Sequence, residues 1–128
     1  MSEHEELLRK LEELGLIEVE GDNVRLTRLV PNLLEKEMPS LARTLALLQL
    51  LGVIEDRDDI TMVMAITVLR ARLEELGREV EREEAAELAS ALAVILDEFA
   101  GEEGRERLEF LLRAGKMIIN NFWGRIGD

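Results

Sequence analysis

The sequence predicts an all-α protein: a compact bundle of five or six helices with one short N-terminal β-hairpin. Apolar residues recur at helical spacing through most of the 128 residues, of which 47% are hydrophobic. Residues 16–27 instead alternate apolar and polar side chains around a turn of glycine, aspartate and asparagine. We expect one domain over residues 1–128, with a helix and hairpin in residues 1–30 and the helical bundle in residues 31–128.

The first helix is expected to begin at Ser2, because Ser2 and Glu5 have the spacing of a capping box. It should end at Gly15, after leucines that share one helical face: Leu7, Leu8, Leu11 and Leu14. The hairpin follows, with its turn at residues 21–23, where Gly, Asp and Asn tolerate a positive φ.

Two prolines divide the next stretch. Pro31 suits the first turn of a short helix over residues 32–38, and Pro39 is expected to open a second helix that ends at Leu51. A helix over residues 60–76 should follow, after three aspartates that can cap it and complement its dipole: Asp56, Asp58 and Asp59.

The last third of the chain predicts further helices. Residues 78–100 become rich in alanine and leucine, and residues 102–114 are amphipathic. A short apolar segment, residues 116–123, precedes the tail.

Two of these helices are apolar on nearly every side: residues 40–51 and 60–69. A domain of this size has little interior in which to enclose two such helices. Either the remaining helices surround them or a partner chain does. We therefore expect a homo-oligomer, most simply a two-fold dimer, or a complex with another protein.

Composition excludes several function classes. The chain has no cysteine and a single histidine, His4, so thiol chemistry and histidine-rich metal sites are excluded. A net charge of −12 disfavours nucleic acid as a partner. No apolar run is long enough for a membrane span, so we expect a cytoplasmic protein. We also expect no cofactor, because the sequence contains no glycine-rich nucleotide-binding loop. The many charges and the lack of cysteine fit a thermophilic source.

The N-terminal pattern suggests one alternative. The leucine-patterned helix and the following LGLIEVEGDNVRLT resemble the end of a winged-helix DNA-binding domain. The resemblance covers about 25 residues, and it implies a DNA-associated regulator in which Arg25 and Arg28 contact the phosphate backbone. The two helices that precede the recognition helix in that family have no counterpart here.

An acidic cluster suggests a second alternative. Glu83, Glu84 and Glu87 resemble the Glu-Glu-x-x-Glu of all-α nucleotide pyrophosphatases, in which such carboxylates hold Mg²⁺. The Glu-x-x-Asp that follows in that family is missing. The other interpretation is a solvated helix face.

The C-terminal sequence KMIINNFWGRIGD combines positive charge with a cluster of apolar side chains. We interpret it either as a docking segment or as a last helix that closes the core. The candidate interaction residues are Arg113, Ile118, Ile119, Phe122 and Trp123. Overall, the sequence favours a non-enzymatic protein that associates with itself or with another protein.

Overall fold

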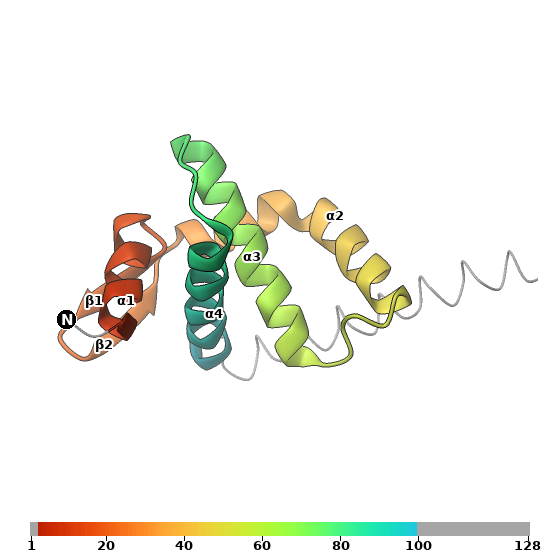
Figure 1. The fold of residues 1–128 in the computed structure, drawn as a ribbon, viewed down its shortest axis with the longest axis horizontal. Helices are drawn as coiled ribbons and strands as arrows, with labels where there is room; N and C mark the ends of the chain where they lie inside the picture. The colour runs from red at the N-terminus through yellow and green to blue at the C-terminus, as the bar shows by residue number, and fades with distance from the viewer. Residues whose placement is uncertain (1–2, 100–128) are drawn as a thin grey trace, which may run out of the picture.

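The computed structural model of the chain describes residues 3–99, drawn as a coloured ribbon in Figure 1. These residues form four helices and one hairpin: α1 (Glu3–Glu13), β1 (Ile17–Glu20), β2 (Asn23–Leu26), α2 (Leu29–Leu50), α3 (Arg57–Leu76) and α4 (Arg82–Phe99). The expectation of a mostly helical protein with a short hairpin is therefore confirmed. The helices expected over residues 102–114 and 116–123 lie outside the described residues, so a total of five or six is not confirmed.

The hairpin is joined closely to α1. Gly15 has a φ of +78°, a conformation that favours glycine, and it turns the chain from the helix into β1. The strands are antiparallel, with Ile17 opposite Leu26. Beyond β2, the backbone N–H of Thr27 donates to the carbonyl oxygen of Leu16, at 3.0 Å. This bond extends the pairing of the strands by one residue. The hairpin is held against the end of α1 by the backbone N–H of Leu16, which donates to the carbonyl oxygen of Leu11 at 3.1 Å.

Helix α2 corrects one expectation. It runs unbroken from Leu29 to Leu50 with Pro39 in its interior, so the expected division at this proline is wrong. Proline removes one helical hydrogen bond. The helix continues because it is anchored on both sides of the proline, by Leu33 in the larger core and by Leu41 in a smaller one.

Helix α3 ends at Leu76 as expected but begins three residues before the expected start at residue 60, so that Asp58 and Asp59 lie in its first turn and Asp56 precedes it. Asp56 accepts a hydrogen bond from the backbone N–H of Asp59 at 3.1 Å, and the carboxylate of Asp59 accepts one from the N–H of Asp56. This is a capping box at the N-terminus. At the other end, Gly77 takes a left-handed conformation, with φ +62°, and ends the helix.

The substitution Asp56→Ala is expected to lower the free energy of unfolding by about 1 kcal/mol, because it removes the cap of α3. Asp58→Ala, in the same first turn but outside the capping box, should cost only about 0.3 kcal/mol through the helix dipole. Urea denaturation of both variants measures the difference. Equal losses would contradict the assigned role of the cap.

The described residues form two cores. The larger core joins α1, the hairpin, the start of α2, α3 and α4, and its centre consists of side chains with almost no exposure: Leu11, Leu16, Ile17, Val68, Leu88 and Leu92. The smaller core lies between α2 and α3 and contains Leu41, Leu45, Ile54 and Ile60. Figure 1 shows α3 between α4 and the C-terminal half of α2. Helix α3 is therefore enclosed from two sides, whereas the C-terminal half of α2 rests on α3.

Candidate interaction surfaces

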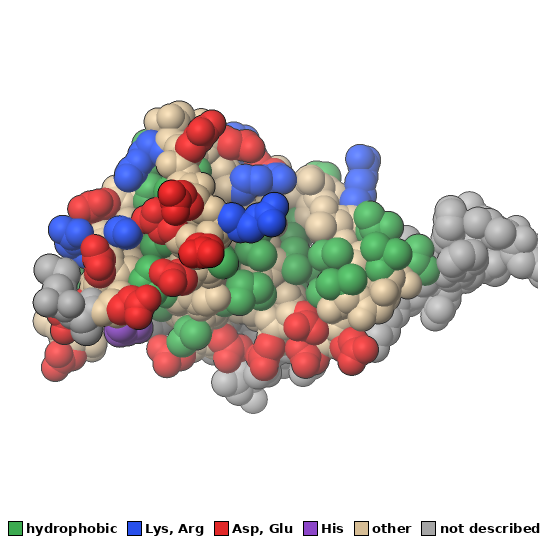
Figure 2. Space-filling model, viewed as in Figure 1, with side chains coloured by type: hydrophobic (Ala, Val, Ile, Leu, Met, Phe, Trp, Pro, Cys, Tyr) green, Lys and Arg blue, Asp and Glu red, His purple; other side chains and the backbone are tan. Residues whose placement is uncertain are grey.

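A group of large apolar side chains lies exposed at the C-terminal end of α2 and in the loop that follows. The exposed fractions are 55% for Leu47, 36% for Leu50, 65% for Leu51 and 61% for Val53. Figure 2 shows hydrophobic side chains gathered over this part of α2 and along α3. We refer to these four residues as the α2 surface.

The sequence of α2 explains why this surface exists. In the stretch over residues 38–54, Arg43 is the single charged residue. Leu41 and Leu45 point into the smaller core, and Leu47, Leu50 and Leu51 occupy the opposite side at helical spacing. The helix is apolar on both sides, but the described residues cover one of them. Of the two apolar stretches found in the sequence, residues 60–69 are buried or half-buried apart from Ile66, whereas residues 40–51 leave Leu47, Leu50 and Leu51 exposed.

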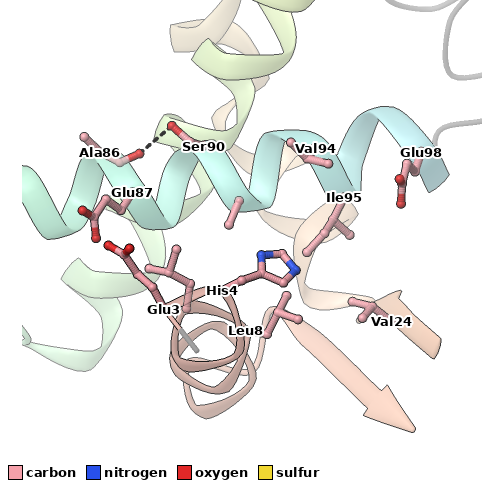
Figure 3. A pocket seen from close by; sticks show the side chains of 12 residues that line it. Glu3, His4, Leu8, Val24, Ala86, Glu87, Ser90, Val94, Ile95 and Glu98 are labelled. Carbon is pink, nitrogen blue, oxygen red and sulfur yellow. Dashed lines mark hydrogen bonds between the residues drawn. The ribbon is translucent and has the colours of Figure 1, made fainter. Parts of the chain in front are cut away.

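A second apolar feature is a groove between α1, β2 and α4, with a volume of about 600 Å³ (Figure 3). Its lining includes Leu8, Val24, Val94 and Ile95, and the side chain of Val94 is 60% exposed. Its charged lining residues are acidic, and they lie on α1 and α4: Glu3, Glu87 and Glu98. His4 also faces this space in Figure 3. We call this feature the α1–α4 groove.

The acidic cluster that suggests a magnesium site, Glu83, Glu84 and Glu87, lies in the N-terminal turns of α4. Glu83 is exposed, Glu87 lines the α1–α4 groove, and Glu84 forms an ion pair with Lys10 of α1, Nζ to Oε1 at 2.8 Å. The hydrogen bond to Glu84 raises the pKa of the Lys10 ammonium above its ordinary value. Within residues 3–99, no group of three or more histidine, aspartate or glutamate side chains is placed to hold a metal ion. The ion pair between Lys10 and Glu84 therefore links α1 to α4.

The arginines proposed for DNA contact lie at the hairpin and at the start of α2. Helix α1 leads directly into the hairpin, which is the element order that the winged-helix resemblance implies. Arg25 projects from β2 toward β1, with Nη2 at 2.9 Å from Glu18 Oε2 and at 3.9 Å from Glu20 Oε1. Arg28 is exposed at the N-cap position of α2. Arg25 therefore contacts two carboxylates of its own hairpin.

The C-terminal candidates Arg113, Ile118, Ile119, Phe122 and Trp123 lie outside the described residues. The α2 surface lies largely within residues 40–51, which the sequence indicates as an apolar helix, and the structure adds which of its side chains are exposed. The α1–α4 groove is a candidate that the sequence does not indicate. It is assembled from α1, β2 and α4, which are distant in the sequence, so no local pattern predicts it.

In the part of the chain from residue 3 to residue 99, every helix is too short or too polar to cross a membrane. No protein-family model, no curated protein and no solved structure matches the chain.

Proposed function

We propose that the protein acts by association rather than by catalysis, and that it forms a two-fold homodimer through the α2 surface. The observation that supports this is the group of four large apolar side chains exposed at the C-terminal end of α2 and in the loop that follows. Contiguous apolar surface of this kind is typical of protein–protein interfaces.

Charge favours a second copy as the partner. The chain carries a net charge of −12, so most of its surfaces would repel an identical molecule. The stretch over residues 38–54 carries one charge, that of Arg43. A two-fold interface places the same surface on both sides, so it requires a surface that does not repel itself. Residues 38–54 meet that requirement.

Apolar burial supplies the driving force in this arrangement. Covering an exposed leucine stabilises a complex by up to about 1.5–3 kcal/mol. In a two-fold dimer each of Leu47, Leu50 and Leu51 is covered twice, once in each copy. The dimer would cover the side of α2 that the described residues leave exposed.

Spin labels can test the location of the interface, because the chain has no cysteine of its own. One label is attached to Thr44→Cys, which is exposed one turn before Leu47, and another, in a separate protein, to Asp22→Cys at the hairpin turn. The hairpin and the C-terminal end of α2 lie at opposite ends of the molecule (Figure 1).

Dipolar spectroscopy then gives one distance between the two copies for each variant. We expect the distance at Thr44 to be much shorter than the distance at Asp22. A shorter distance at Asp22 would contradict an interface on α2, and the absence of any dipolar signal at both positions would contradict dimerisation.

A further inference from the structure

We propose that the α1–α4 groove binds the basic C-terminal segment of the same chain, residues 113–126. This inference is independent of the α2 surface, because the two features lie on different parts of the molecule. It rests on the chemistry of the groove, the chemistry of the segment and the distance between them.

The groove suits a ligand that is both apolar and positively charged. Val24, Val94 and Ile95 give it an apolar lining, while Glu3, Glu87 and Glu98 supply negative charge. Among the described residues, neither lysine nor arginine lines it. An apolar contact area surrounded by charges of one sign selects a partner whose charges have the opposite sign.

The segment over residues 113–126 has this complementary chemistry. It contains three basic residues, Arg113, Lys116 and Arg125, and no acidic residue, within a chain whose net charge is −12. Between the basic residues lie five large apolar side chains: Met117, Ile118, Ile119, Phe122 and Trp123. Aromatic residues together with arginine are the residue types that contribute most to protein interfaces.

The segment can reach the groove of its own chain. Helix α4 ends at Phe99, one residue after Glu98, which lines the groove. Residues 100–112 can span roughly 40 Å when extended and about 20 Å as the helix that the sequence predicts, and the 18 residues of α4 extend about 27 Å. A segment tethered over so short a distance has an effective concentration in the millimolar range. The same chain is therefore favoured over a second copy as the source of the segment.

Trp123 provides the test, because it is the single tryptophan of a chain without tyrosine. In the full-length protein, we expect its fluorescence to be blue-shifted and weakly quenched by acrylamide. Val94→Glu should shift the emission to the red and increase the quenching rate constant several-fold. Val94 is 60% exposed, so the fold should tolerate this change, and far-ultraviolet circular dichroism verifies it.

A pair of charge reversals tests the electrostatic part. Glu87→Arg with Glu98→Arg should also expose Trp123, because both carboxylates line the groove. The matched control is Glu35→Arg with Glu79→Arg, which changes the net charge equally at exposed positions outside the groove. The control should leave the emission unchanged.

The double variant Leu47→Glu/Leu51→Glu separates this inference from the proposed dimer. It should leave Trp123 protected, whatever it does to the dimer. Trp123 exposed to solvent in the wild-type protein would overturn the inference, as would protection that Val94→Glu does not remove. Protection that is lost on dilution, or in the double variant, would assign the segment to a second copy and contradict docking within one chain.

Discussion

The double variant Leu47→Glu/Leu51→Glu is expected to be a monomer at concentrations at which the wild-type protein is a dimer. Leu47 and Leu51 are each more than half exposed in the single chain. A two-fold interface would cover both leucines in both copies, which makes four leucine side chains in all. If covering all four contributes at least about 3 kcal/mol, half the lower limit for complete burial, the dimer Kd should rise at least about 100-fold. The added carboxylates repel each other across the two-fold axis. Sedimentation velocity over a dilution series measures this Kd.

The control is Leu76→Glu, at the last residue of α3, which places the same charge on another exposed leucine. It should leave the Kd unchanged. Circular dichroism should show equal helix content in both proteins, because neither variant touches a buried side chain. A double variant that remains as dimeric as the wild type would contradict the α2 surface as the interface.

The substitution Leu92→Ala is expected to lower the free energy of unfolding by about 2–5 kcal/mol. Leu92 is completely buried on α4, in the core shared with α1, the hairpin and α3. Removing its branched end costs the transfer free energy of those atoms and leaves a cavity that the surrounding helices fill only in part. Urea denaturation, with the slope compared between variants, measures the loss.

The control is Glu83→Ala, on the same helix. Glu83 is exposed and lies outside the α1–α4 groove, so its truncation should change the free energy of unfolding by no more than about 0.5 kcal/mol. If Leu92→Ala cost as little as Glu83→Ala, the packing of α4 against the core would be wrong.

The sequence predicted the local structures whose signals lie within a few residues. The alternation around residues 21–23 predicted the hairpin, and the aspartates before residue 60 predicted a capped start for α3, although the helix begins earlier, at Arg57. The division predicted at Pro39 is wrong because the effect of proline on a helix is local, whereas the packing that keeps α2 continuous comes from α3, which begins 18 residues further along the chain. Local propensity could not reveal that support.

The candidate sites also combine features that the local sequence predicts with features that depend on packing between distant segments. The composition of residues 40–51 predicted an apolar helix that either the remaining helices or a partner chain would cover, but it could not tell which side would face the chain's own core. That choice depends on Leu41 and Leu45, which face α3 and leave Leu47 and Leu51 outside. The spacing of the acidic cluster predicts that its carboxylates act together. The fold gives them different contacts, because Glu84 forms an ion pair with Lys10 and Glu87 lines the α1–α4 groove.

The two proposals describe one protein with two apolar surfaces of different electrostatic character. The α2 surface lies in a stretch with a single charge and suits an identical partner, whereas the α1–α4 groove has acidic edges and suits a basic segment. Their variants make opposite predictions: Leu47→Glu/Leu51→Glu should change the mass and not the tryptophan emission, and Val94→Glu should do the reverse.

Sedimentation equilibrium of the full-length wild-type protein tests the central claim, self-association, most directly. The chain mass is 14.5 kDa. We expect a weight-average mass that approaches twice this value as the concentration rises and increases no further, because a two-fold interface is closed. A mass of 14.5 kDa that does not change with concentration would contradict a homodimer.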